Sequence, residues 1–491
     1  MKSSLLLGLD LGTTNVKALV TDRAGRPLAH GACPVRLFHV GNGGVEQDID
    51  EIERAALTAF REAVRSEDAA GIEAIGISSQ GGAMQMLDAQ GQPLGRVVSW
   101  LDQRGRPFDD ALTAELGGEW FRHRIGHGRS GMAIGQVLRL RQEQPDWFRA
   151  AHRLGFVGDV IVSRLCGRAA HDGTSCGLTL LHNPGRRTYD PDVLQRLRLE
   201  PGQLPDLVSL REVAGPLRRE VAQQTGLRAG IPISAAIHDQ YASALGTGAV
   251  RAGTVMVGTG TAWVLLAVSD HLPTPAIDDA FVCGHVVEGL FGQILSLVNG
   301  GSSLTWVLEL LGLTGKDSGE LDALVASAPA GSAGLGFWPF LAPGGASGLT
   351  PETKGRLSGL QLSHRPAHVV RAVVEGLVFE LNRHLGFLRQ AGLPPRQLVL
   401  SGGAASSRVT PQIVADVTDL PLRCVSASEA SLLGAAIIAR GLLEPGMSLG
   451  DLVNEMAPLP QVVEPGADAP FYQEQYQRYV RALPGHESNR P

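Results

Sequence analysis

The sequence has few cysteines and no CxxC pair. Its five cysteines are scattered over 491 residues, at Cys33, Cys166, Cys176, Cys283 and Cys424. This odd number and irregular spacing argue against a disulfide framework and against a zinc site, and they favour free thiols in a reducing compartment. We therefore expect a cytoplasmic protein.

The sequence also lacks a basic excess and a long apolar run. Lys and Arg total 43 against 49 Asp and Glu, a formal net charge of −6, so no electrostatic attraction favours nucleic acid or an anionic membrane as a partner. The first apolar run is short and interrupted by Asp10, which argues against a signal peptide and a membrane span. With 44% hydrophobic and 19% charged residues, the composition is typical of a soluble globular protein, and the length predicts two or three domains.

The most informative stretch is residues 5–22, LLLGLDLGTTNVKALVTD. It predicts an apolar strand, a tight turn and a second apolar strand. Asp10 falls inside the first strand, where a charge needs a partner or a metal. Gly12, Thr13 and Thr14 follow with little bulk, two hydroxyls and free backbone N–H groups. This combination suits the phosphates of a nucleotide and the accompanying Mg²⁺. A β-hairpin with a polar turn is the alternative.

Several further strands end in polar, glycine-rich loops. A helical pattern over 46–65 precedes a strand over 72–78, which leads into Gln80, Gly81 and Gly82. A strand over 97–100 delivers Asp102 and Arg104 in the same way. Open α/β sheets bind their ligands at strand ends of this kind.

The first hairpin has a counterpart in the second half of the chain. Residues 254–270, TVMVGTGTAWVLLAVSD, repeat the order of apolar strand, Gly-Thr turn, apolar strand and Asp. This repeat predicts two similar lobes, each giving one phosphate-binding hairpin to a shared cleft. The second copy has Met256 or Val257 where the first has Asp10, so we expect one hairpin to hold the metal and the other to hold phosphate. Chance similarity between two apolar hairpins is the alternative.

The last third contains a long helical pattern over 364–388 and a strand over 397–400 that runs into Ser401-Gly402-Gly403-Ala404. Farther on, residues 429–436, EASLLGAA, open another helix. Small residues here would let an adenine ring approach the backbone, and for 434–436 close helix packing is an equally good explanation.

These motifs together resemble the FGGY carbohydrate kinases, and most closely the xylulose kinases, from Leu5 to about Glu444. The matching segments, in chain order, are GLDLGTTNVKALV, GISSQ, SWLDQR, HDQYASALGTG, VGTGTAW, GRLSGLQLSHRPAHVVRAVVEG, LSGGAASS and EASLLGAA.

The resemblance implies an α/β fold with two ribonuclease-H-like domains, of the actin and hexokinase superfamily, flanking a deep nucleotide and sugar cleft. Residues 1–245 would form the sugar-binding lobe with the first phosphate hairpin, and residues 246–445 the ATP-binding lobe. Residues 446–491 would be an extension that packs on the lobes or partly frays. The resemblance also allows a homodimer, although no interface is evident in the sequence.

The implied reaction is transfer of the ATP γ-phosphate to a hydroxyl of a ketose (xylulose-like) or polyol, with ATP and Mg²⁺ as cofactors. Asp239 matches the catalytic base and Asp10 the acid near the metal. A carboxylate in reach of the acceptor hydroxyl is what this chemistry requires. For Asp239, capping of the helix that begins at Gln240 is the alternative.

The remaining site residues follow by position. For the sugar they are Gln80, Gly81, Gly82, Trp100, Asp102 and Arg104, together with Asp239. For the nucleotide they are Gly12, Thr13, Thr14, Lys17, Gly258, Thr259, Gly301, Gly402, Gly403, Ala404 and Ser407. For Trp100, a place in the core is as good an interpretation as stacking on a sugar.

The chain departs from the family pattern mainly on the sugar side. Gly81 and Gly82 replace the usual Met-His, which would leave space and only backbone donors. Gln136 and Arg139 stand where Lys and Trp are usual, and 343–347 replace a Gly-Glu-Arg-x-Pro segment. We therefore expect a substrate other than simply D-xylulose.

Three alternatives remain open at this point. The first is a family member acting on another sugar or polyol, of the ribulose, fuculose, glycerol or erythritol type. The second is a chaperone-like ATPase, because such proteins also begin with GLDLGTTN. The third is a sugar sensor that has lost catalysis.

Overall fold

The computed structural model describes residues 4–65, 69–342, 347–350, 352–425 and 429–484. The chain forms two compact units, each assembled from three segments. The first unit contains 1–250, 270–292 and 429–458, and the second contains 251–269, 293–428 and 459–491.

This division differs from the three continuous ranges expected from the sequence. The segment 429–458 returns to the first unit because its helix packs on that unit's sheet. The expected extension, 446–491, is shared between the units, and residues 485–491 lie outside the described part of the chain. Chain continuity is thus a poor guide to which residues share a core.

The helices of the first unit are α1 (Ile49–Ala63), α2 (Arg106–Leu116), α3 (Gly118–Ile125), α4 (Ala133–Glu143), α5 (Pro145–Ala150), α6 (Val157–Cys166), α7 (Gly173–Gly177), α8 (Pro191–Leu197), α9 (Arg219–Thr225), α10 (Asp239–Thr247), α15 (Ala430–Leu443) and α16 (Leu449–Met456), with 3₁₀ turns η1 (Ala69–Gly71) and η2 (Pro201–Gln203). Its strands are β1 (Leu5–Leu11), β2 (Asn15–Asp22), β3 (Pro27–Pro34), β4 (Phe38–Val40), β5 (Gly44–Gln47), β6 (Ile72–Ser79), β7 (Met84–Leu87), β8 (Val97–Val98), β9 (Arg153–Phe156), β10 (Ala170–His171), β11 (His182–Asn183), β12 (Thr188–Tyr189), β13 (Asp206–Leu207), β14 (Gly215–Pro216), β15 (Pro232–His238) and β18 (Phe281–Gly284).

The helices of the second unit are α11 (Gly301–Leu310), α12 (Ser318–Ala326), α13 (Pro366–Gln390), α14 (Thr410–Thr418) and α17 (Ala469–Arg481), with η3 (Ala330–Gly334) and η4 (Gly403–Ser406). Its strands are β16 (Thr254–Thr259), β17 (Trp263–Ser269), most of β19 (Phe291–Leu297), β20 (Gly336–Trp338), β21 (Arg356–Ser358), β22 (Gln397–Gly402), β23 (Leu422–Val425) and β24 (Gln461–Val463).

The main sheet of the first unit has the order β13-β10-β15-β6-β1-β2-β3, with β14 paired to β15. The hairpin β1–β2 is antiparallel, whereas β1, β6 and β15 run parallel. Along β1 the side chains alternate between the two faces of the sheet. Leu5, Leu7, Leu9 and Leu11 join the core shared with α1 and α6, so Asp10 lies on the opposite face.

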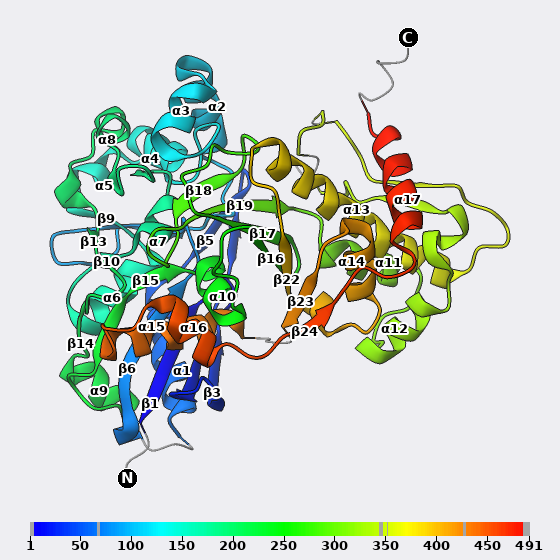
Figure 1. Ribbon diagram of the computed structural model, residues 1–491. Helices are drawn as coiled ribbons and strands as arrows, with labels where there is room; N and C mark the ends of the chain where they lie inside the picture. Colours follow the sequence, from blue (N-terminus) through cyan, green and yellow to red (C-terminus); the bar gives the residue numbers. More distant parts are fainter. Residues whose placement is uncertain (1–3, 66–68, 343–346, 351, 426–428, 485–491) are drawn as a thin grey trace. The chain divides into compact units, whose positions relative to one another are not determined.

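The opposite face of this sheet is covered by α15, which Figure 1 draws in orange across the blue strands. The contact is between backbones. A Cβ at Gly8 of β1 would lie 2.3 Å from the Leu432 carbonyl oxygen, and one at Gly76 of β6 would lie 1.8 Å from that of Ala435. Only glycine allows the helix to lie this close to the strands.

Helix α10 crosses the same helix at an equally short distance. A Cβ at Gly434 would lie 1.8 Å from the Ala242 carbonyl oxygen, and one at Gly246 would lie 2.0 Å from that of Ala430. Of the two interpretations of residues 434–436, the structure therefore supports close helix packing.

The second unit repeats the arrangement of the first. Its sheet includes the path β19-β17-β16-β22-β23-β24. Strands β16 and β17 form an antiparallel hairpin, and β16, β22 and β23 run parallel. The pair β16–β17 next to β22 thus corresponds to β1–β2 next to β6. The repeat seen in the sequence is a repeat of topology.

The observed ends of several helices and strands differ by a few residues from those expected from the sequence. The helix expected over 46–65 begins at Ile49, because Gly44–Gln47 forms β5 and the Asp48 carboxylate caps the helix. The strand expected over 97–100 is limited to Val97–Val98, and the long helix expected over 364–388 covers Pro366–Gln390.

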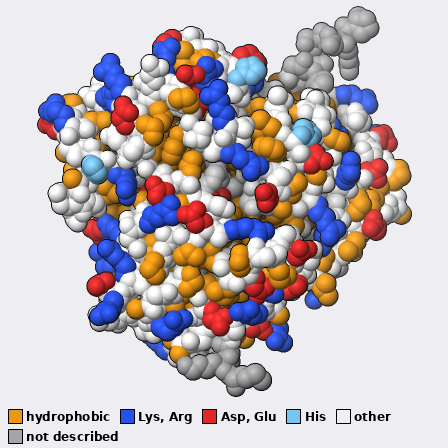
Figure 2. Space-filling model, turned by 60° about the vertical axis from the view of Figure 1, so that its left-hand side comes forward, with side chains coloured by type: hydrophobic (Ala, Val, Ile, Leu, Met, Phe, Trp, Pro, Cys, Tyr) orange, Lys and Arg blue, Asp and Glu red, His pale blue; other side chains and the backbone are white. Residues whose placement is uncertain are grey.

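The surface carries charges of both signs. Figure 2 shows Lys and Arg side chains interspersed with Asp and Glu over the face in view, with no area of one sign. Within the described residues, none of the helices combines the length and the apolar character that crossing a bilayer requires.

The close contact between α10 and α15 makes Gly434→Ala destabilising. The added methyl group collides with a backbone oxygen that no rotamer change can move, and we expect a loss of about 3 kcal/mol in the free energy of unfolding. Thermal and urea denaturation measure this loss.

The matched control is Gly441→Ala in the same helix. There a Cβ meets only the ends of flexible side chains, with Leu449 Cδ2 at 3.2 Å as the nearest atom, and the higher helix propensity of alanine offsets this contact. Equal losses in the two variants would contradict the packing argument.

Candidate active site

Three parallel strands of the first unit deliver polar residues to one edge of its sheet. Asp10 near the end of β1 pairs with Ser78 of β6, and Ser79 pairs with His238 at the end of β15. Gln80 and Asp239 follow directly after these strands. Since the carboxyl ends of parallel strands meet at the same edge, the predicted residues Asp10, Gln80 and Asp239 are neighbours.

Two hydroxyl groups hold the Asp10 carboxylate. Ser78 Oγ donates to Oδ1 and Ser431 Oγ donates to Oδ2, both at 2.8 Å. Burial raises the pKa of Asp10, and the negative charge of Asp239 raises it further, whereas the two hydroxyl hydrogen bonds oppose these effects. The predicted Lys17 is the cross-strand neighbour of Asp10 and also favours its charged form.

Asp239 is the first residue of α10, and its cap is the preceding His238. The Asp239 side chain is one-third exposed. Its Oδ1 is nonetheless buried and, within the described part of the chain, has no hydrogen-bond partner. Burial raises the pKa of this carboxyl to about 6. A carboxylate with one open and one enclosed oxygen, and a pKa near neutrality, is suited to accept a proton.

The predicted phosphate turn contacts the predicted sugar residues through Thr13. Trp100 Nε1 donates to Thr13 Oγ1 at 3.0 Å, and Thr13 Oγ1 lies 3.3 Å from Gln80 Oε1. The Trp100 side chain is 46% exposed, so its alternative assignment to the core is wrong. Gly12 adjoins this cluster, and the next residue, Thr14, is exposed.

The loop at Gly81 and Gly82 does not leave the empty space expected from the sequence. A Cβ at Gly81 would lie 2.5 Å from Cδ2 of His238, and one at Gly82 would lie 2.3 Å from Cε of Met132. Gly82 also has φ of +72°, which disfavours residues other than glycine. The missing side chains have been replaced by an imidazole and a thioether from other elements.

Asp102 and Arg104 form a hydrogen-bonded network with neighbouring protein groups. Asp102 Oδ2 accepts from the Val45 N–H at 3.0 Å and from Arg104. Gln136 donates to Asp102, and Arg139 donates to Gln136. The Asp102 side chain is fully buried, so its carboxylate oxygens accept hydrogen bonds from protein groups and are not accessible to a ligand.

The second unit gathers the other predicted nucleotide residues around Thr259. Thr259 Oγ1 donates to the Ser401 carbonyl oxygen at 2.6 Å and accepts from the Ala404 N–H at 3.0 Å. Thr259 pairs with Gly402 in the sheet, next to the pair of Gly258 and Ser401.

The turn after β22 needs glycine. Gly402 has φ of +84°, and a Cβ there would lie 2.8 Å from the Thr259 carbonyl oxygen. Gly403 follows as the first residue of η4 and is exposed.

Two predicted residues take structural positions in this unit. Gly301 begins α11, and its N–H donates to the Gly260 carbonyl oxygen at 3.0 Å. Ser407 Oγ donates to Asp322 and accepts from the Thr410 N–H at the start of α14. The Ser407 hydroxyl therefore fixes a helix start and holds α12 beside it.

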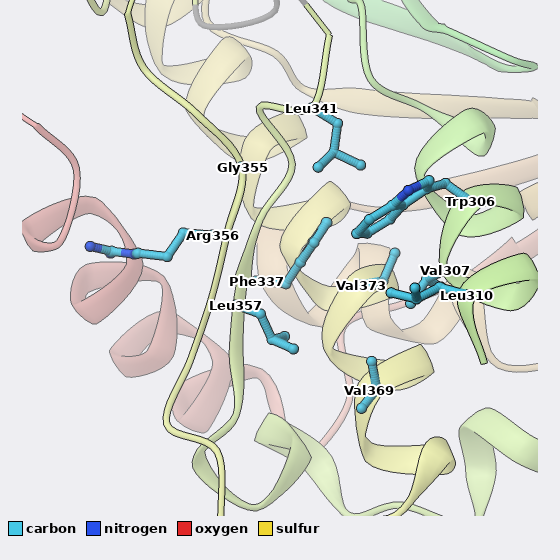
Figure 3. A pocket seen from close by; sticks show the side chains of 10 residues that line it. All are labelled: Trp306, Val307, Leu310, Phe337, Leu341, Gly355, Arg356, Leu357, Val369 and Val373. Carbon is cyan, nitrogen blue, oxygen red and sulfur yellow. The ribbon is translucent and has the colours of Figure 1, made fainter.

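The second unit also contains an apolar pocket, shown in Figure 3. Trp306 and Leu310 of α11, Phe337 of β20 and Val373 of α13 are among its lining residues, and the Arg356 guanidinium points away from it. None of the predicted site residues is in this lining. The predicted site and this apolar pocket therefore have no residue in common.

Comparison with known families decides the class of this protein. Models of the N-terminal and C-terminal domains of the FGGY family of carbohydrate kinases match residues 5–246 and 253–440. The chain belongs to this family. It is therefore a carbohydrate kinase with the two-domain, actin-like α/β fold expected from the sequence, and the chaperone alternative is excluded.

Several relatives of this FGGY kinase are named for different acceptors. Xylulose kinase of Escherichia coli (strain K12) is 26% identical over 493 residues, covering 99% of this chain and 98% of the relative. Apulose kinase of Pectobacterium atrosepticum is 28% identical over 504 residues, covering 98% of each. The structure of Plasmodium falciparum glycerol kinase with ADP has a TM-score of 0.90 at 19% identity, covering 98% of this chain and 97% of that one.

Some residues of the candidate site were not predicted from the sequence. Ser78 and Ser431, which hold Asp10, lie in the motifs GISSQ and EASLLGAA without an assigned role, and Met132 lies outside any motif. Two adjacent serines at a strand end are a usable signal. No sequence signal identifies Met132, because it comes next to Gly82 only in the folded chain.

Because burial disfavours the charged form of the Asp239 carboxyl group, we predict that Asp239→Asn stabilises the FGGY kinase in the absence of ligands. Because its pKa is about 6 when folded and near 3.8 when unfolded, the wild type loses stability as the pH rises from about 4 to 6. The variant escapes this loss and removes the repulsion of Asp10. We expect a gain of about 1 kcal/mol at pH 7.5 that shrinks toward pH 5. Thermal denaturation across this range measures it.

The control for this measurement is Asp468→Asn, which alters an exposed carboxyl group that makes no capping hydrogen bond to α17 and should change stability little at any of these pH values. A variant Asp239→Asn that is less stable than the wild type at pH 7.5 would contradict the electrostatic argument.

Proposed function

We propose that this kinase transfers the γ-phosphate of ATP to a hydroxyl of a ketose (xylulose-like) or polyol, with Asp239 as the general base. The observation that carries the proposal is the carboxylate at the start of α10. One oxygen is enclosed, the side chain is one-third exposed, and burial raises its pKa to about 6. Phosphoryl transfer needs such a group beside the acceptor hydroxyl.

Nucleotide binding is proposed at the Gly-Thr turns of the two hairpins. In the first unit these are Gly12, Thr13 and Thr14, of which Thr14 is exposed. In the second they are Gly258 and Thr259, with the turn at Gly402–Ala404. Short turns with little side-chain bulk expose backbone N–H groups to phosphate oxygens. The ADP in the glycerol kinase structure supports the choice of nucleotide.

The carboxylates of the first unit also fit a Mg²⁺ ion. Asp10 and Asp239 are close enough for the charge of Asp239 to raise the pKa of Asp10, and a cation beside them would relieve this repulsion. Mg²⁺ usually binds one or two carboxylates and keeps several waters and phosphate oxygens as ligands. We propose that Asp10 faces the metal through water. When bound, the metal would neutralise charge on the transferred phosphoryl group.

The proposed base would act while the rest of the site holds the acceptor. Asp239 would take the proton of the attacking hydroxyl through its open oxygen. Trp100, 46% exposed beside Thr13, offers an aromatic face for the apolar side of a sugar. Gln80 would supply an amide group, whereas Asp102 and Arg104 would brace the pocket without contacting the substrate.

The acceptor is proposed to differ from D-xylulose. Gly81 and Gly82 lack the Met-His of xylulose kinases, and the space beside them is filled by His238 and Met132. A hydrogen-bond donor from the loop is thereby replaced by an apolar thioether, which changes the hydroxyl pattern that the pocket satisfies.

The base assignment predicts that Asp239→Asn abolishes phosphorylation. Loss of the proton acceptor should lower kcat at least about 10³-fold, because catalysis by a positioned base contributes this much. The Kd for ATP should change less than about threefold, since the amide keeps the shape of the side chain. Coupled-enzyme turnover and calorimetric titration with ATP measure the two quantities.

The control for the base assignment is Gln80→Ala, which should raise KM for the acceptor more than it lowers kcat. Retention of a tenth or more of the wild-type kcat in Asp239→Asn would remove Asp239 from the mechanism.

The altered loop predicts the outcome of a substrate panel. Ketopentoses, larger ketoses and polyols should be compared by kcat/KM at saturating MgATP. We expect at least one of them to exceed D-xylulose by about tenfold or more, because a buried polar group that is left unpaired with the wrong sugar costs at least this much. A clear preference for D-xylulose would contradict the proposed substrate.

A further inference from the structure

His238 lies between the proposed base and the sugar loop, and the sequence motifs assign it no role. It is the last residue of β15 and the cap of α10. Its Nδ1 accepts the Gln240 N–H at 3.3 Å, and its Nε2 lies 3.3 Å from Asp239 Oδ1. The imidazole thus contacts the helix start with one nitrogen and the proposed base with the other.

The first contact determines where the ring proton is. A nitrogen that accepts an N–H must present a lone pair, so Nδ1 carries no proton and the proton of the neutral ring is on Nε2. Burial supports the neutral state, because it lowers the pKa of His238 to about 3. The Nε2–H group therefore faces the enclosed oxygen of Asp239, which has no other hydrogen-bond partner within the described residues.

The surroundings hold the imidazole in place. The His238 N–H donates to Thr174 Oγ1 at 3.2 Å, and this hydroxyl in turn donates to the buried Asp172. On the other side lies Gly81, where a Cβ would be 2.5 Å from His238 Cδ2 and 2.7 Å from Nε2. Glycine at position 81 is therefore required for the ring to occupy this place.

We propose that His238 is a positioning residue for Asp239, and that Gly81 is its steric complement. The Nε2–H group holds Oδ1 and thereby directs the other oxygen of the carboxylate toward the acceptor hydroxyl. This inference rests on the proposed role of Asp239.

The contact distance is consistent with this role. At 3.3 Å the pair of Nε2 and Oδ1 is longer than a strong hydrogen bond and is not aligned as one. Such contacts in ligand-free sites often tighten when the substrate is bound. Without a donor on Oδ1, Gln240 still contacts the carboxylate, but the group is held less firmly, and misplacement of a base by about 1 Å can cost about 10²-fold in rate.

Two conservative variants separate the two contacts of the ring. His238→Asn places an amide oxygen near the position of Nδ1, so it keeps the cap of α10 and loses the donor to Asp239. His238→Gln can place an amide N–H near the position of Nε2, so it keeps the donor and weakens the cap.

We expect opposite effects from these variants. His238→Asn should lower kcat about 10- to 100-fold, with KM for ATP within about twofold and Tm within about 2 °C of the wild type. His238→Gln should recover kcat to within about fivefold of the wild type and should have a lower Tm. Equal kcat in both variants, or loss of kcat that follows the loss of Tm, would overturn the proposal.

A third variant tests the steric complement without changing His238. Gly81→Ala should displace the imidazole and lower kcat about tenfold or more at unchanged KM for ATP. Its control is Gly202→Ala, at a position where a Cβ meets no atom within 4 Å. A kcat for Gly81→Ala equal to that of the control would overturn the proposal, even if the His238 variants failed to fold.

These outcomes distinguish the inference from the proposed function. If Asp239→Asn retains turnover, Asp239 is not the base and the proposed function fails. If Asp239→Asn is inactive while His238→Asn and Gly81→Ala have the kcat of the wild type, only the positioning role of His238 fails.

Discussion

The close approach of α15 to the first sheet is the constraint on which the rest of the site depends. Glycines in β1 and β6 let the helix backbone lie against the strands, and Ser431 at its start thereby reaches Asp10. These two residues are 421 positions apart in the chain. The carboxylate is thus stabilised by a contact that exists only when the segment 429–458 has joined the first unit. Folding of this segment and formation of the site are coupled.

Two carboxylates beside each other in a buried place are costly for stability. Ser78 and Ser431 offset part of this cost at Asp10, whereas the enclosed oxygen of Asp239 has no aligned hydrogen-bond donor among the described residues. The raised pKa values of both groups express this unfavourable environment. Such local strain is common where a protein prepares a site for a cation or a proton, and the surrounding packing must compensate for it.

The surroundings of Gly81 and Gly82, the proposed sugar loop, differ from what the sequence alone suggests. From the sequence, Gly81 and Gly82 are expected to enlarge the pocket, but His238 and Met132 occupy the vacated volume. The loop is therefore lined by an imidazole and a thioether where the sequence suggests open space. Interiors pack densely, so a lost side chain is usually compensated by a neighbour. Substrate preference within a family can change in this way while the phosphate-binding turns stay the same.

The sequence by itself determined the fold class, the two hairpins and the positions of Asp10, Thr13, Asp239 and Thr259. These follow from local patterns, because strand alternation and glycine-rich turns depend on neighbours in the chain. Only the tertiary structure decided that 429–458 belongs to the first unit, that Ser431 holds Asp10, that Trp100 is exposed and that His238 fills the space at Gly81. These are contacts between distant segments, and the packing of one backbone on another has no periodic signature in either segment. The candidate residues could therefore be proposed from the sequence, whereas their contacts with one another required the fold.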